Sequence, residues 1–286
     1  MAKIEYRAIS DVDFDAFTAA FNRAYSDYFM PIVMTAPAFR ALIERDDLDL
    51  DRSIAALDGD AIIGTGLLGV RDRLGWIGGM GVIPERRRQG IGRQMMHHLI
   101  DRARQAGLEH VDLEVLEANA GAYALYREMG FEDQRYLLTL DRVPAEIAAQ
   151  PSDQFQIERR STSTVLEYYA TFHDIPNCWQ RALPSLQALA PYVPSWAALD
   201  NGHIAGYAIG WANEYSVRLI DFAASPHSDR AAVARALLAH LHQQNPDAHG
   251  NSYNIAEDDP VLSAFHAMGY SLSFRQIEMR LRVAGA

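Results

Sequence analysis

Arginine and glycine gather in one short stretch, PERRRQGIGRQMMHHL at residues 84–99, of a chain whose formal net charge is −11. Gly90 and Gly92 stand directly before apolar residues at helical spacing, so a glycine turn leads into a helix. The first N–H groups of a helix lack partners within it, and the helix dipole makes that end positive. Because glycine has no β-carbon, a phosphate can approach these N–H groups closely. The stretch therefore predicts a phosphate-binding turn. The side chains that would add positive charge to it are those of Arg87, Arg88 and Arg93.

Two common phosphate loops do not fit this turn. A dinucleotide-binding fingerprint needs a third glycine three residues after Gly92, where the chain has Met95. A P-loop needs Gly-Lys followed by Ser or Thr, and the sequence contains no such triplet. On these residues alone, a solvated basic turn before a helix stays open as the alternative.

The elements expected around the turn alternate between strands and helices. Ser10 and Asp13 form a candidate capping box for a first helix with an aromatic face. Apolar alternation, turn residues and helical spacing then predict the following order. The expected elements are two strands at 53–70 joined at Asp58-Gly59, a glycine-rich strand at 76–83, a helix at 92–106, a strand at 110–116, a helix at 119–130 and a strand at 131–140.

This pattern occurs twice in the chain. SIAALDGDAIIG at 53–64 aligns with SWAALDNGHIAG at 195–206, and ALYREMGF at 124–131 aligns with SAFHAMGY at 263–270. A stretch of linker composition at 141–154 lies between the two copies. The sequence therefore predicts two tandem α/β domains, at 1–143 and 152–286.

Composition excludes several classes of protein. Hydrophobic residues make up 49% and charged residues 22%, as in ordinary globular proteins. An acidic chain without a broad basic face argues against a nucleic-acid partner, and no apolar run is long enough to span a membrane. A single cysteine, Cys178, excludes an internal disulfide and a multi-cysteine zinc site, and no histidines stand at metal-binding spacing. We expect a cytoplasmic enzyme or binding protein without a metal.

Two motifs follow one another in the first half of the chain. The first is Val-x-Pro followed by Arg-x-x-Gly-x-Gly, at Val82, Pro84, Arg87, Gly90 and Gly92. The second is formed by Asn119, Ala122, Leu125, Tyr126, Gly130 and Phe131. Through both, the chain resembles the Gcn5-related N-acetyltransferase (GNAT) family, strongly over residues 4–140 and weakly in the second half.

The resemblance implies a fold and a donor substrate. The implied fold class is α/β, with two tandem GNAT-like domains that each have a mixed, mostly antiparallel central sheet flanked by helices. The implied donor is acetyl-CoA, with its diphosphate on the amides of the turn and its pantetheine arm where two strands splay apart. The residues implied to bind it are Val82, Arg87, Arg88, Gln89, Gly90, Ile91, Gly92, Arg93 and Asn119.

The resemblance also implies a general acid but leaves the base open. Tyr126 would donate a proton to the departing thiolate as a general acid. An amine acceptor must lose a proton before it attacks, and Glu114 is the first candidate base, although it could also face solvent. Asp27, Tyr25 and Tyr28 are alternatives that could line the acceptor side.

The second copy departs from the motifs where the chemistry should occur. The residues Asp229, Ala232, Ala234, Asp258 and Phe265 stand in place of Arg87, Gly90, Gly92, Asn119 and Tyr126. The new carboxylates oppose a diphosphate, the methyl groups block its approach, and phenylalanine cannot donate a proton. We therefore expect 155–286 to keep the fold, to bind no CoA and to complete the acceptor pocket or the domain interface.

The sequence thus predicts an N-acetyltransferase that moves an acetyl group from acetyl-CoA to a primary amine by direct transfer in a ternary complex. The acceptor would be a small molecule or a peptide. A non-catalytic protein that binds or senses acyl-CoA stays open, as does an acyltransferase that makes esters or uses longer acyl chains. The sequence leaves the identity of the acceptor and the oligomeric state open.

Overall fold

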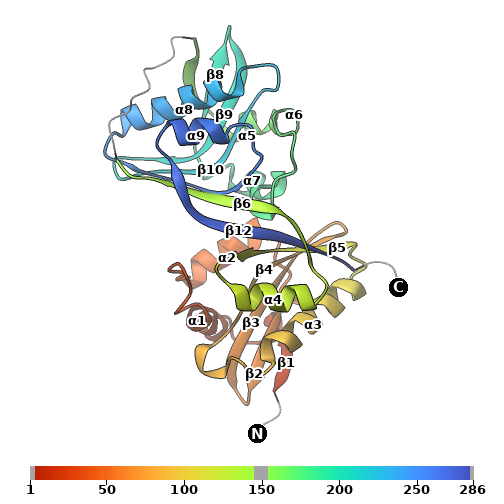
Figure 1. Ribbon diagram of the computed structural model, residues 1–286. Coiled ribbons are helices and arrows are strands. Elements are labelled where there is room, and N and C mark those ends of the chain that lie inside the picture. Colours follow the sequence, from red (N-terminus) through yellow and green to blue (C-terminus); the bar gives the residue numbers. More distant parts are fainter. Residues whose placement is uncertain (1–3, 145–153, 284–286) are drawn as a thin grey trace. The chain divides into compact units, whose positions relative to one another are not determined.

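Strands and helices alternate along the chain in the computed structural model, which describes residues 4–144 and 154–283 (Figure 1). The chain divides into two compact units, one of Met1–Gln134 with Glu278–Ala286 and the other of Arg135–Ile277. The expected α/β class, with a mixed and mostly antiparallel sheet in each half, is confirmed. The domain bounds 1–143 and 152–286 stay a prediction.

The first unit begins with a strand and two helices. Its elements are β1 (Glu5–Ala8), η1 (Ile9–Asp11), α1 (Phe14–Ala24), α2 (Ala36–Arg45), β2 (Ile54–Asp58), β3 (Ala61–Arg71), β4 (Leu74–Val82), η2 (Pro84–Arg86), α3 (Ile91–Gln105), β5 (His110–Leu116) and α4 (Ala120–Glu128). Strand β6 (Glu132–Arg142) starts in this unit, and the end of β12 (Ser271–Arg282) returns to it. Strands β1 to β4 pair antiparallel in chain order, whereas β5 joins β4 in parallel.

Helices cover both faces of this sheet. Glycines of β3 face α3, since a β-carbon at Gly66 would lie 3.0 Å from Leu99. Glycines of β4 face α1, since a β-carbon at Gly81 would lie 3.0 Å from Ala24. The apolar residues predicted on one face of α3 are all buried: Met95, Met96, Leu99, Ile100 and Ala103.

The start of α1 differs from the predicted one. The side chain of Asp13 accepts a hydrogen bond from the Ala16 amide at 2.8 Å and caps the helix. Ser10 lies in the short helix η1 instead, so the predicted capping box is wrong. The aspartate alone satisfies the helix end.

Strand β4 departs from its neighbours at a glycine. Its pairing with β3 shifts between Leu67↔Gly79 and Leu68↔Ile77, which leaves Gly78 as the extra residue of a β-bulge. Its parallel pairing with β5 ends at Trp76↔Asp112, although both strands continue beyond it. The two strands therefore splay apart over the second half of β4.

The second unit repeats this plan. Its elements are the main part of β6, then β7 (Gln156–Arg160), α5 (Thr162–Leu166), α6 (Tyr169–Phe172), η3 (Trp179–Arg181), α7 (Leu183–Leu189), β8 (Ser195–Asp200), β9 (His203–Ala212), β10 (Ser216–Ala224), α8 (Arg230–Gln244), β11 (His249–Ala256), α9 (Leu262–Ala267) and most of β12. Strands β7 to β10 pair antiparallel in chain order, and β11 joins β10 in parallel. The bulge also recurs, because the β9–β10 register shifts between Leu219 and Asp221.

The splay of the second unit is filled from within. Parallel pairing of β10 with β11 ends at Leu219↔Ser252. Beyond it, the fully buried Arg181 donates to Asp221 Oδ1 on β10 at 2.9 Å and to the Asn254 carbonyl on β11 at 3.1 Å. His173 and Tyr207 hold the other Asp221 oxygen at 3.1 and 2.9 Å. The chain's own side chains therefore occupy the space between these two strands.

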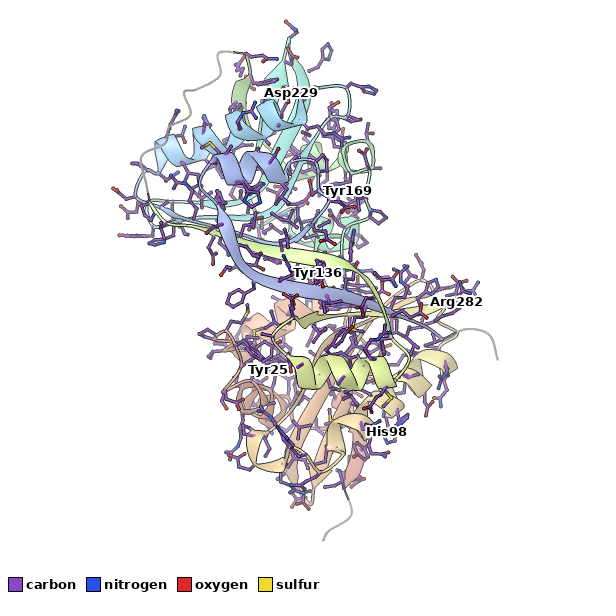
Figure 2. The ribbon with its side chains drawn as sticks, viewed as in Figure 1. Tyr25, His98, Tyr136, Tyr169, Asp229 and Arg282 are labelled. Carbon is purple, nitrogen blue, oxygen red and sulfur yellow. The ribbon has the colours of Figure 1, made fainter. Side chains whose placement is uncertain are left out.

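The start of α8, the helix that follows this splay, carries a carboxylate that would repel an anion. Asp229, labelled in Figure 2, accepts a hydrogen bond from the Ala232 amide at 3.0 Å and caps α8. Its carboxylate thus stands at the helix end that would attract a phosphate.

We expect Asp221→Asn to lower the free energy of unfolding by about 3–5 kcal/mol, because it leaves the buried Arg181 charge without its counterion. Burial alone would raise the pKa of Asp221, but His173 and Arg181 hold it below its usual range, so the carboxylate is charged at neutral pH. Urea unfolding followed by tryptophan fluorescence measures the change.

Asp174→Asn is the matched control, since Asp174 pairs with Arg230 at 2.5 Å while 53% of its side chain is exposed. Exposed ion pairs contribute little. Equal stability of the Asp221→Asn and Asp174→Asn variants would contradict a structural role for the buried pair.

Candidate active site

The bulge of β4 lies under an aromatic ring. A β-carbon at Gly78 would lie 2.2 Å from the Trp76 side chain, so the indole rests directly on the bulged backbone. On the α1 side, a β-carbon at Gly79 would lie 3.3 Å from the Tyr25 hydroxyl. Glycine is required here because two aromatic side chains approach the main chain where β4 leaves β5.

The predicted phosphate turn has the backbone that an anion site needs. Gly90, at φ +79°, is the N-cap of α3, and none of the described side chains caps this helix end. Arg88 is also left-handed, at φ +60°. Among the described residues, a β-carbon at Gly90 would meet nothing within 4 Å, and one at Gly92 nothing closer than 3.9 Å. In the described parts of the chain, the start of α3 therefore has no side-chain cap, and β-carbons at its two glycines would meet no close neighbour, as an anion-binding turn requires.

The basic side chains of the turn have different surroundings. Arg87 forms an ion pair with Asp27 at 2.7 Å, and Arg93 pairs with Glu128 on α4. Arg88 is exposed. The side chains of the three arginines predicted to add charge are thus not equivalent. What the three residues have in common is a main-chain amide in or beside the turn.

Tyr126 lies on α4 among other tyrosines. Only 7% of it is exposed, and burial raises the pKa of its phenol. Burial also raises the pKa values of Tyr25 and Tyr28, and the nearby Tyr28 raises those of Tyr25 and Tyr126 further. Tyr25, labelled in Figure 2, hydrogen-bonds to the main chain of Met80 on β4. The phenol of Tyr126 therefore stays protonated at neutral pH and lies near the splayed half of β4.

Asn119 connects this cluster to the start of α4. Its side chain accepts from the Ala122 amide at 3.3 Å and so caps the helix. It also hydrogen-bonds to the phenol of Tyr28. The structure thus brings together Asn119, Tyr126 and the two tyrosines that the sequence offered as alternatives.

Glu114 lies on β5, beyond the last residue paired with β4. Its Oε2 accepts a hydrogen bond from Trp76 Nε1 at 2.8 Å, whereas Oε1 is buried and has no hydrogen-bond partner among the described residues. The expectation that it could face solvent is therefore wrong. Burial raises the pKa of Glu114 to about 8; the Trp76 hydrogen bond lowers it, and the carboxylates of Glu278, Asp112 and Asp46 raise it.

Sequence analysis missed Trp76 and the side-chain bonds of Arg87. The sequence pattern that could have indicated Trp76 is an aromatic residue two positions before a glycine in the same strand, Gly78. No metal site was predicted, and the described ranges 4–144 and 154–283 hold no group of three or more His, Cys, Asp or Glu side chains placed to bind a metal. Over the same ranges, no helix combines the length and apolar character needed to cross a membrane.

Two curated relatives match parts of the chain. The ribosomal protein bS18-alanine N-acetyltransferase of Escherichia coli (strain K12) is 41% identical over 75 residues, which are 24% of this chain and 51% of that protein. The streptothricin acetyltransferase of Streptomyces lavendulae is 50% identical over 50 residues, or 18% of this chain and 26% of that protein. The chain thus spans about half the length of the first relative and about a quarter of the second.

Solved structures match over nearly the whole chain. A tandem GNAT protein from the clavulanic acid biosynthesis pathway has a TM-score of 0.71 at 16% identity and covers 99% of this chain and 100% of its own. A GCN5-related N-acetyltransferase from Sphaerobacter thermophilus has a TM-score of 0.70 at 14% identity and covers 100% and 98%. At these identities the likeness is one of fold.

A family model matches most of the first unit. Residues 14–131 match the model of the acetyltransferase (GNAT) family, a range that contains the phosphate turn, the splay and Tyr126. Residues 14–131 are therefore similar to the acetyltransferase (GNAT) family, and the chain as a whole is similar in fold to a tandem GNAT protein.

Proposed function

We propose that this protein is an N-acetyltransferase that moves the acetyl group of acetyl-CoA directly to a primary amine in a ternary complex. The observation that supports this most is the buried, protonated phenol of Tyr126 near the splayed half of β4. In the second unit the equivalent residue is the buried Phe265, and the equivalent splay is filled by Arg181 and Asp221.

The diphosphate of the substrate acetyl-CoA would be bound by the amides of residues 87–93 at the start of α3. Several charge-assisted hydrogen bonds, each of about 1.5–3 kcal/mol, are enough to hold a diphosphate. The main chain beyond the end of the β4–β5 pairing would bind the pantetheine arm through hydrogen bonds. Val82 ends this strand. Asn119 bonds to Tyr28, whose ring packs on Tyr25, the tyrosine that bonds to the main chain of Met80 in the strand.

In the reaction, the acceptor nitrogen attacks the thioester carbonyl carbon, a C–N bond forms and the C–S bond breaks. The departing thiolate takes the proton of Tyr126, whose buried phenol holds it until then, and the phenolate regains a proton from the nitrogen that has become the amide. General-acid catalysis of this kind contributes about 10²–10⁴ in rate. Loss of the phenolic hydroxyl should therefore affect turnover more than the binding of CoA.

Glu114 would take the proton that the acceptor ammonium must lose. Its Oε1, which no described residue hydrogen-bonds, is the atom free to accept it, and Trp76 fixes the other oxygen. With a pKa of about 8, the carboxyl is close to the pH at which a base works best.

The class of acceptor that we propose is based on the names of the two relatives. One relative is named for an alanine of ribosomal protein bS18 and the other for streptothricin, so both protein and small-molecule amines are acceptors in this family. We propose a small-molecule or peptide amine here and a cytoplasmic location, where acetyl-CoA is available. An acyltransferase that forms esters or uses longer acyl chains needs the same residues and is the alternative.

Acetyl-CoA consumption across a panel of amines, amino acids and peptides, measured by thiol release, tests the proposal. We expect turnover with at least one class of amine and a loss of at least tenfold in Tyr126→Phe, with the Kd of CoA changed less than twofold. Tyr123→Phe is the control, because Tyr123 lies on the same helix but donates to Asp133 at 2.9 Å on the exposed surface.

Equal turnover of the Tyr126→Phe and Tyr123→Phe variants would remove Tyr126 from the mechanism. Tight CoA binding without turnover on any acceptor would favour a sensing protein instead.

The pH profile should report Glu114. Because the carboxylate is the active form, kcat/KM should rise with pH through an apparent pKa of about 8. Trp76→Phe removes the hydrogen bond that lowers this pKa, so the rise should move to higher pH. In Glu114→Gln, the part of the rise that comes from the carboxyl should be absent. Since the acceptor's own titration is the same for all variants, an unchanged profile in Trp76→Phe and Glu114→Gln would refute this role.

Calorimetric titration should give one CoA per chain, bound by the first unit. Gly90→Ala should weaken it at least tenfold, because alanine is strained at φ +79° and distorts the turn. Gly59→Ala is the matched control: Gly59 also has a positive φ, +59°, and open space around it, but it lies in the β2–β3 hairpin. Two bound equivalents would show that the second unit has kept a site.

A further inference from the structure

The side chain of Arg87 points away from the phosphate turn that its main chain helps to form. Its Nε donates to the Val82 carbonyl at 2.9 Å, and its Nη1 donates to Asp27 Oδ2 at 2.8 Å. Its Nη2 donates to Asp27 Oδ1 at 2.7 Å and to the Ala24 carbonyl at 3.0 Å. Four of the five N–H groups of a guanidinium are thus in use. Little of this side chain is left to bind a diphosphate.

These bonds join the turn to the segment that follows α1. Ala24 is the last residue of α1, so its carbonyl lacks a partner within the helix and Arg87 supplies one. Asp27 lies three residues farther on. Although 52% of its side chain is exposed, its carboxylate receives two parallel N–H bonds, the bidentate geometry in which an exposed ion pair does contribute, whereas Asp174 receives one. One side chain therefore fixes both the end of α1 and the start of the next loop.

The loop held in this way is residues 25–34, here called the tyrosine loop. At its far end, Asn22 closes it with two hydrogen bonds to the main chain of Met34, each 2.8 Å long. On its inner side, Tyr25 bonds to the main chain of Met80 and Tyr28 to Asn119. On its outer side, 52% of Phe29 and 81% of Val33 are exposed. The loop thus has its polar contacts on the side of the proposed site and exposed apolar side chains on the other.

We propose that Arg87 and Asp27 are a positioning pair that holds the tyrosine loop beside Tyr126 and thereby shapes the acceptor side of the site. Its effect on the acceptor rests on the proposed function, whereas its effect on the loop does not. The pair acts through Tyr25 and Tyr28 and touches no reacting atom. The main-chain amide of Arg87 keeps its separate place in the phosphate turn.

Asp27→Asn and Arg87→Ala test the pair, with Arg88→Ala as control, because that change removes the same charge from the same turn and leaves Asp27 paired. The first readout is hydrogen exchange of the amides of residues 25–34. Exchange should become at least tenfold faster in Arg87→Ala, less so in Asp27→Asn, and should not change in Arg88→Ala.

The second readout separates the two substrates. The KM of the acceptor should rise three- to tenfold in Asp27→Asn and more in Arg87→Ala, while the Kd of CoA stays within twofold in both. The double variant should be no worse than Arg87→Ala, because the two residues act as a unit.

Unchanged exchange in both variants would overturn the proposal. A tenfold loss of CoA affinity in Arg87→Ala with normal exchange would also overturn it, since the side chain would then serve the diphosphate. If the wild-type protein acetylates no amine, the proposed function fails, but the exchange data still decide whether Arg87 and Asp27 hold the loop.

Discussion

The hydrogen bonds between β4 and β5 end at Trp76 and Asp112, and the rest of the first unit's site depends on that ending. A buried main chain must bond to something, so two strands that stop pairing leave N–H and C=O groups for other partners. The bulge at Gly78 bends β4 at the same place, and Tyr25 bonds to its main chain at Met80. The splay is thus a gap in the hydrogen bonding of the sheet itself.

The second unit meets the same constraint differently. Its strands stop pairing at the equivalent point, but Arg181 satisfies the carbonyl of Asn254 and the carboxylate of Asp221 together. A buried charge is tolerated only when it is paired and hydrogen-bonded, and here His173 and Tyr207 complete the shell. One fold therefore accommodates either an open splay or a closed one, depending on a few side chains.

Local features of the chain could be read from the sequence because their causes are local. The strand at 110–116 and the apolar face of α3 follow from spacing, and Gly59, between β2 and β3, has the positive φ that glycine adopts readily. The long-range contacts could not be read, since the Trp76–Glu114 and Arg87–Asp27 bonds join residues 38 and 60 positions apart. Residue spacing predicts which face of a helix or strand is buried, but not which distant side chain bonds to it. The predicted cap at Ser10 is wrong because Asp13, three residues on, binds the helix end instead.

The return of β12 to the first unit has a consequence for how the chain is made. Arg280 binds Asp112 of β5 through two bonds of 2.7 Å, and the Val283 amide donates to the Glu109 carbonyl at 2.9 Å. During synthesis β5 therefore keeps this edge unpaired until residues 271–283 have left the ribosome. The first unit can therefore be completed only after the second unit has been translated.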